Sequence, residues 1–185
     1  MDTTTAYLEL SKDKEYNVTI DNHHKCALTG VVNCLISEDE LCDLRVLGVD
    51  AEVLSVTVYS TAHIMGTHFK SGEWGKWPRC GSVITCVMEG RSLYGYVIKF
   101  LSVDSNASPG FASVVWLGAP SYPFDTPLVV RVSLNGVDEN GYRLMDTYGR
   151  IIPITQIDPS PVVVETADDE NYFMMRLSGY DTMRS

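Results

Sequence analysis

The sequence has no apolar run long enough to cross a bilayer. A spanning helix needs about 18 or more uninterrupted apolar residues, and polar or charged residues break every run here sooner. The start of the chain, MDTTTAYLEL, also lacks the basic stretch and apolar core of a secretory signal. We therefore expect an intracellular protein that is neither secreted nor integral to a membrane.

Closely spaced cysteine pairs are absent too. The chain has five cysteines, an odd number, and none stands in a C-x-x-C spacing: Cys26, Cys34, Cys42, Cys80 and Cys86. In a reducing compartment such cysteines stay as free thiols. No disulfide framework is therefore expected.

A zinc site is disfavoured by the spacing of the candidate ligands. His63 and His68 stand at an H-x₃₋₅-H distance, but Cys80 and Cys86 are too far apart for a tight pair. Cys86 also lies in an expected strand, where a free cysteine behaves as a small buried hydrophobe. We expect loop histidines and core cysteines, with no metal and no cofactor.

Catalytic signatures are missing as well. The sequence has no G-x-S-x-G elbow, Walker loop, G-x-G-x-x-G or H-E-x-x-H motif. Its acids are scattered on expected turns, where aspartates usually bind local backbone amides. We expect a protein that is not an enzyme. The alternative is a site assembled in space from turn acids and the histidines His23, His24 and His63.

Negative charge is abundant: the net charge is −10. This charge opposes broad binding to nucleic acid and to anionic membranes. Its distribution is uneven, because residues 63–99 hold five Lys or Arg side chains against two glutamates. Any anion-binding face is expected in this segment, and the competing interpretation is a set of solvated loop charges.

Residue patterning predicts a chain made mostly of strands. Strands are expected at 6–10, 16–20, 52–60, 82–88, 112–117, 127–134, 161–165 and 171–177. A hairpin is expected over 142–154, with Pro153 on an edge strand because proline cannot donate to a ladder.

A few segments break this pattern. Helices are expected at 26–36 and at 93–103, with a buried strand as the alternative for the second. The capping-box pair Ser37 and Glu40 predicts a further helical turn that runs to about Arg45. Residues 63–81 are expected to form a long loop.

These elements predict an α+β, mainly β fold. We expect one antiparallel sheet or open sandwich with one or two short helices packed on it. Residues 1–177 would form a single globular domain, and residues 178–185 a flexible C-terminal tail.

The most distinctive segment is KSGEWGKWPRCG at 70–81. Indoles beside cations are suited to stack on bases, to lie at a membrane interface or to anchor a protein contact; alternatively, both tryptophans plug the core. The acidic charge favours protein contact among the functional alternatives. The candidate residues for protein or anion contact are Phe69, Lys70, Trp74, Lys76, Trp77, Arg79 and Arg91.

Two stretches carry a family resemblance. LYGYVIKFLSVDSNASPGF at 93–111, followed by YPFDTPLVVRVSL at 122–134, resembles the core of rhabdovirus matrix proteins, especially the short ones of plant viruses. In that family an amphipathic helix and a polar segment precede an aromatic turn and an alternating strand. This chain lacks the basic N-terminal arm that is usual in the family and the P-P-x-Y budding motif of its animal-virus members. The resemblance implies a self-associating protein of the host cytoplasm and the virion, which condenses nucleoprotein against an envelope.

We therefore expect a non-enzymatic viral structural, matrix-like protein that acts by self-association. An acidic face of one copy would meet the Trp/Lys/Arg loop of the next, head to tail. The expected partners are a second copy and, by the resemblance, the nucleocapsid protein; the charge disfavours peripheral membrane contact, and no small-molecule substrate is expected. The alternative is a monomeric binding module that holds a host protein or nucleic acid through the loop at 69–80.

Overall fold

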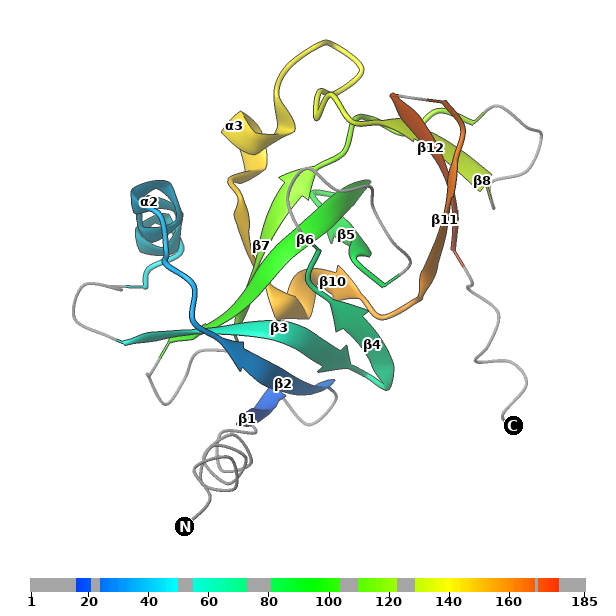
Figure 1. The fold of residues 1–185 in the computed structure, drawn as a ribbon. Helices are drawn as coiled ribbons and strands as arrows, with labels where there is room; N and C mark the ends of the chain where they lie inside the picture. The colour runs from blue at the N-terminus through cyan, green and yellow to red at the C-terminus, as the bar shows by residue number, and fades with distance from the viewer. Residues whose placement is uncertain are drawn as a thin grey trace.

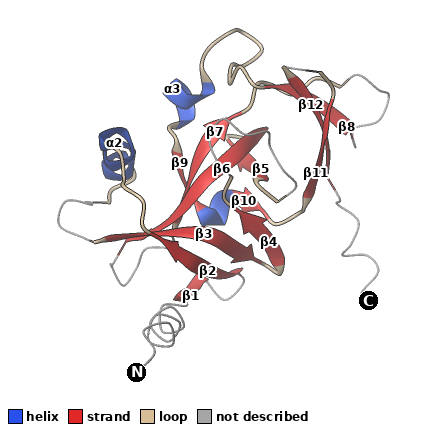
Figure 2. Cartoon of the chain, viewed as in Figure 1, coloured by secondary structure: helices blue, strands red, loops and turns tan. Residues whose placement is uncertain are grey.

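The computed structural model describes residues 16–20, 24–49, 55–72, 81–103, 110–122, 129–168 and 170–176. Over these residues the chain is mainly β, with two open antiparallel sheets and a few short helices (Figure 1 and Figure 2). The fold class expected from the sequence is thus confirmed. The strand expected at 6–10 and the tail expected at 178–185 lie outside the described residues.

The larger sheet is built around one long strand, β6 (Arg91–Val103). One edge of β6 pairs first with β5 (Val83–Met88) and then, towards its end, with β3 (Val56–Ile64). The other edge pairs with β7 (Phe111–Trp116). The strands expected at 52–60, 82–88 and 112–117 are therefore present.

Three further strands complete this sheet around β3. β2 (His24–Val32) pairs along β3, and β1 (Tyr16–Ile20) pairs with β2. β4 (Thr67–Lys70) folds back on the last part of β3. The turn between them, Met65-Gly66, has φ of 49° and 85°. Two left-handed residues form the kind of turn whose twist suits a two-residue hairpin.

One short segment connects opposite sides of the β5–β6–β7 group. β9 (Ile151–Pro153) pairs with β7, the 3-10 turn η1 (Ile154–Gln156) follows, and β10 (Ile157–Asp158) pairs with β5. β7 is the described partner of β9, so the expected position of Pro153 in an edge strand is confirmed.

The smaller sheet covers one face of the larger one. It consists of β8 (Val129–Ser133), β11 (Val162–Thr166) and β12 (Asn171–Arg176), in the order β11-β12-β8. Val132 and Tyr172 of this sheet share a buried cluster with Tyr94 and Tyr96 of β6. Figure 1 shows the small sheet on the side of the molecule away from α2.

The helix α2 (Glu38–Val46) begins at the expected place. The Ser37 hydroxyl accepts from the Glu40 N–H, and the Glu40 carboxylate accepts from the Ser37 N–H, which confirms the capping box. Leu44 is fully buried with Val58 and Leu101 in a cluster beneath the helix. Burial of such a side chain contributes about 1.5–3 kcal/mol. No helix in the described part of the chain has the length and apolarity to span a membrane.

The helix expected at 93–103 is wrong, because this segment is the strand β6. Leu93 and Val97 belong to one buried cluster, while Tyr94 and Tyr96 belong to the cluster on the other face. A strand covered on both faces shows a continuous apolar run instead of alternation. That run happens to match helical spacing.

The helix expected at 26–36 is also wrong, since its first seven residues lie in β2. Cys26 and Leu28 are buried while Ala27 between them is half-buried, which is the alternation of a strand. Gly30 adopts a φ of 72°, outside the helical region.

Two further expectations need correction. Residues 142–154 do not form a hairpin, because α3 (Leu144–Tyr148) occupies the first half, with Leu144 and Tyr148 packed on the main core. Within the expected loop at 63–81, β3 continues to Ile64 and β4 follows. The remainder of that loop, residues 73–80, lies outside the described residues.

Candidate functional site

Polar side chains from three elements meet between α2 and the larger sheet, and we call this group (Ser37, Glu40, Lys99 and Ser113) the α2 junction. Glu40 Oε2 accepts from Lys99 Nζ and from the Ser37 backbone N–H, each at 2.9 Å. Its Oε1 accepts from the Ser113 hydroxyl at 2.7 Å. Lys99 Nζ also donates to the Leu35 carbonyl at 3.1 Å. Both carboxylate oxygens and the ammonium group are therefore satisfied inside the molecule.

The environment of Glu40 keeps its carboxylate charged. Burial acts to raise the pKa of Glu40, but hydrogen bonds from Ser37, Lys99 and Ser113, together with the Lys99 charge, outweigh it and lower the pKa below its ordinary value. A carboxylate and an ammonium bound to each other in this way fix a helix on a sheet.

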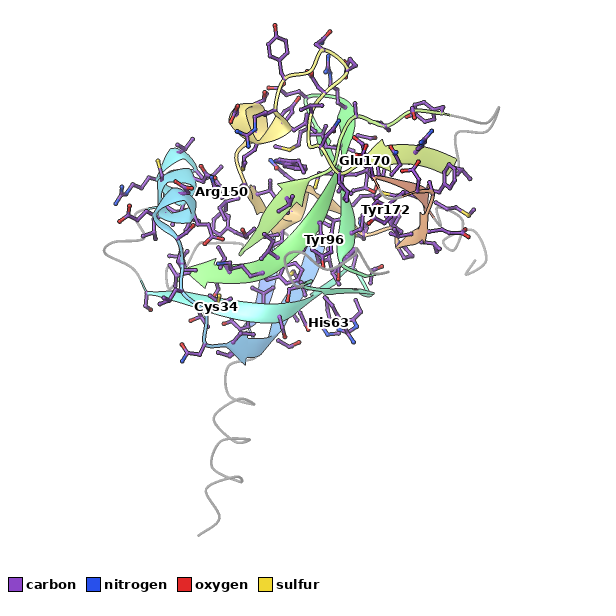
Figure 3. All side chains as sticks on the ribbon, turned by 45° about the horizontal axis from the view of Figure 1, so that its top comes forward. Cys34, His63, Tyr96, Arg150, Glu170 and Tyr172 are labelled. Atoms are coloured by element: carbon purple, nitrogen blue, oxygen red, sulfur yellow. The ribbon has the colours of Figure 1, made fainter. Side chains whose placement is uncertain are left out.

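A second polar contact holds the outer side of α2. The Arg150 backbone N–H donates to Asp43 Oδ2 at 2.9 Å, and the Arg150 guanidinium lies 3.3 Å from the same oxygen and 3.1 Å from Asp39 Oδ2. Figure 3 shows Arg150 beside α2. The function of this contact is again to position the helix.

Several turn aspartates bind their own backbone. Asp138 Oδ1 accepts from the N–H groups of Asn140 and Tyr142, at 2.9 and 2.8 Å. Asp158 Oδ1 accepts from the Ser160 N–H at 2.8 Å. These carboxylates hold turns, as the sequence indicated, and the contacts supply no acid–base pair with a histidine.

The histidines His63 and His68, which the sequence left as loop residues, form a close pair in the structure. These residues face each other across β3 and β4, and their rings stack with centroids 4.4 Å apart and 20° between planes. Both side chains are exposed. Burial, followed by the charges of His63 and Lys70, lowers the pKa of His68. A sequence signal existed: the two histidines are symmetric about the Met65-Gly66 turn.

Cys86 does not belong with these histidines. Its side chain is fully buried in the main core, where burial and then the charge of Asp158 raise the pKa of the thiol to about 12. Cys26 is buried in the same core, and burial raises its pKa to about 11. Protonated core thiols of this kind are poor metal ligands.

The expected loop site divides into placed and unplaced residues. Phe69 is 1% exposed in the main core, so the expectation that it contacts a partner is wrong in this conformation. Lys70 is exposed at the end of β4. Trp74, Lys76, Trp77 and Arg79 lie outside the described residues.

Arg91, also an expected contact residue, begins β6 at the surface. Its guanidinium lies 3.2 Å from the Glu139 carboxylate, and both side chains are more than half exposed. Together with the Lys99–Glu40 contact, this pair neutralises two of the cations that made residues 63–99 locally basic.

Exposed apolar residues stand before α2 in the chain and at its end, and the sequence had not indicated that they would be exposed. We call them the α2 flank: Val31, Val32, Leu35, Val46 and Leu47. Leu35 is 89% exposed and Val46 82% exposed. Exposed apolar side chains that lie together often mark surfaces for protein contact, and Val31, Val32 and Leu35 stand close together in the chain.

No family model, no curated protein and no solved structure matches the chain. The function is therefore argued from its own residues.

Proposed function

We propose that the chain is a non-enzymatic structural protein that assembles with copies of itself through the α2 flank. The observation that carries the proposal is the set of exposed apolar side chains at the end of β2 and just after it, where Val31, Val32 and Leu35 stand within five residues. An apolar surface of this kind is stabilised when another protein removes it from water.

Charge supplies the orientation of this contact. The first turn of α2 is acidic, with Glu38 and Asp39 exposed beside Leu35. The segment 69–80 is rich in lysine, arginine and tryptophan. An acidic, apolar surface complements a basic, aromatic one, and complementary charge raises association rates and sets specificity.

The position of the two surfaces favours a contact between copies. β2 leaves the sheet where Val32 pairs with Val58, near the start of β3, whereas β4 and the exposed Lys70 pair with the last half of β3. Figure 3 shows Cys34 and His63 towards opposite ends of β3. Val32 and Lys70 thus lie towards opposite ends of β3. Two complementary surfaces that lie apart on one molecule are suited to head-to-tail association, which gives rings or filaments.

The matrix-like role within this proposal is supported by the sequence resemblance at 93–111 and 122–134. The amphipathic helix included in that resemblance is the strand β6 here. The viral role, the virion location and the nucleocapsid partner therefore rest on the remaining stretch, where β8 supplies the alternating strand.

The test is the solution mass by light scattering on a sizing column, across protein concentration and salt. The proposal predicts oligomers that dissociate as salt rises. Leu35→Ser should remain monomeric at concentrations where the parent assembles, because it removes the most exposed apolar side chain of the α2 flank.

The matched control is Tyr142→Ser. Tyr142 is 70% exposed but lies in the turn before α3, outside the α2 flank, so this variant should assemble like the parent. A parent chain that is monomeric under every condition would refute self-association. That outcome would direct attention to the alternative of a binding module that uses the loop at 69–80.

A further inference from the structure

The β3–β4 hairpin brings two imidazole groups to one face. His63 and His68 are direct cross-strand partners, and Ala27 of β2 lies opposite His63 on its other side. Ala27 has a small side chain, so no bulky neighbour on β2 crowds the two imidazoles. His63, His68 and Lys70 are exposed, while Ala62 and Phe69 on the other face are buried in the core.

The hydrogen-bond pattern makes this a close pair. The Lys70 N–H donates away from β3, to the Gly81 carbonyl at 2.7 Å, whereas the Ser71 N–H donates to Ser60 of β3 at 2.7 Å. The backbone N–H groups of a strand point alternately to its two edges, so the N–H of His68 points away from β3, as that of Lys70 does. His63 and His68 therefore form a non-hydrogen-bonded pair, in which side chains of an antiparallel ladder approach most closely.

We propose that His63 and His68 form a two-imidazole site for a divalent transition metal ion, with Cu²⁺ bound most tightly and Ni²⁺ and Zn²⁺ less so. The pairing across the hairpin already holds the two side chains together, with ring centroids 4.4 Å apart. Binding then needs only the rings to turn out of their stacked arrangement until one nitrogen of each faces the same ion. Imidazole nitrogen suits these ions, whereas Mg²⁺ and Ca²⁺ prefer oxygen ligands.

The site is open rather than closed. Among the residues that the structure describes, no group of three or more His, Cys, Asp or Glu side chains could hold a metal. Two protein ligands leave the remaining coordination positions to water, in contrast to a structural zinc site with four protein ligands. Only a neutral imidazole offers a nitrogen lone pair for ligation, so protons compete with the metal ion for this site.

The test is a Cu²⁺ titration of the untagged chain at pH 7.5, followed by calorimetry and electron paramagnetic resonance. All variants carry Cys34→Ser and Cys42→Ser, because these two thiols are exposed. We expect one tight ion per chain with two imidazole nitrogens in its spectrum. His63→Thr and His68→Thr should each weaken binding by roughly 100-fold, because one ligand of a bivalent pair is lost.

Threonine suits an exposed strand position, so these variants are expected to fold. A matched control replaces the adjacent pair His23 and His24 by threonine; it removes two histidines and should leave the tight ion in place. If either single-histidine variant at the hairpin binds Cu²⁺ as tightly as the parent, or if the control variant loses the tight ion, the proposal is overturned. The oligomeric state does not enter this readout, so it is independent of the proposed self-association.

Discussion

The two ends of β6 carry the same kind of ion pair in opposite surroundings. Near the end of the strand, Lys99 and Glu40 lie 2.9 Å apart with side chains 13% and 6% exposed. At its start, Arg91 and Glu139 lie 3.2 Å apart with side chains 57% and 59% exposed. The N···O distances are similar, so the two pairs differ in their exposure to water and in the further hydrogen bonds that they make.

This difference separates groups committed to the fold from groups that remain available at the surface. The buried pair adds bonds to Ser37, Ser113 and Leu35, and so fixes the helix that carries the α2 flank. The exposed pair has solvent as a competitor, and exposed pairs contribute about 0–1 kcal/mol. The chain thus places one ion pair, with several further hydrogen bonds, between α2 and the sheet, and a solvent-exposed pair at the other end of β6.

The largest expected effect comes from breaking the buried pair. Lys99→Met should lower the free energy of unfolding by about 3–5 kcal/mol, because the Glu40 carboxylate would remain buried without its counter-charge. The measurement is urea unfolding at pH 7, followed by circular dichroism. A loss below about 1 kcal/mol, the range of an exposed pair, would contradict the proposed difference between the two ends of β6.

A second variant separates the lost charge from the lost contact. In Lys99→Met combined with Glu40→Gln, the amide still accepts from the Ser37 N–H, but no charge is left buried. Replacing both members of a buried pair is often far less costly than removing one. We expect the double variant to recover part of the stability that Lys99→Met loses.

Of the contacts that Glu40 makes, the sequence revealed only the local one, with Ser37. Ser37 and Glu40 are three residues apart, and their capping box was readable without a structure. Lys99 and Ser113 are 59 and 73 residues from Glu40, so only the folded sheet brings them together. The same limit explains β6, whose two buried faces depend on a second sheet that local spacing does not reveal.

The next expected effect is on stability in acid. Because the pKa of Glu40 is lowered in the folded state, the unfolded chain binds more protons below the ordinary value of 4.5. The stabilisation is therefore present above pH 4.5 and is lost as the pH falls through the folded pKa. Glu40→Gln should be less stable at pH 7 and should flatten the acid slope by up to about 1.4 kcal/mol per pH unit.

The measurement is urea unfolding at a series of pH values between neutral and 3. An acid slope of Glu40→Gln equal to that of the parent would show that Glu40 has no special share in the acid response.

The candidate sites were only partly readable from the sequence. The turn aspartates acted as expected, because Asn, Asp and Gly at a turn act over a few residues. The pairing of His63 with His68 needs the register of β3 and β4, which a single Met-Gly turn sets. The α2 flank could not be anticipated, since exposed and buried apolar residues look alike until the fold decides which are covered.

The smallest expected effect is the coupling energy between Arg91 and Glu139. It tests most directly whether the exposed and the buried ion pair of β6 differ. A double-mutant cycle with Arg91→Met and Glu139→Gln should give a coupling energy of about 0.5 kcal/mol or less, because water solvates both groups and long side chains lose entropy when paired. In about 1 M salt, where the screening length falls to about 3 Å, this coupling should vanish. The cycle with Lys99→Met and Glu40→Gln should keep most of its coupling in the same salt, since solvent ions do not reach a buried pair. If salt erased both couplings equally, burial would not be what distinguishes the two ends of β6.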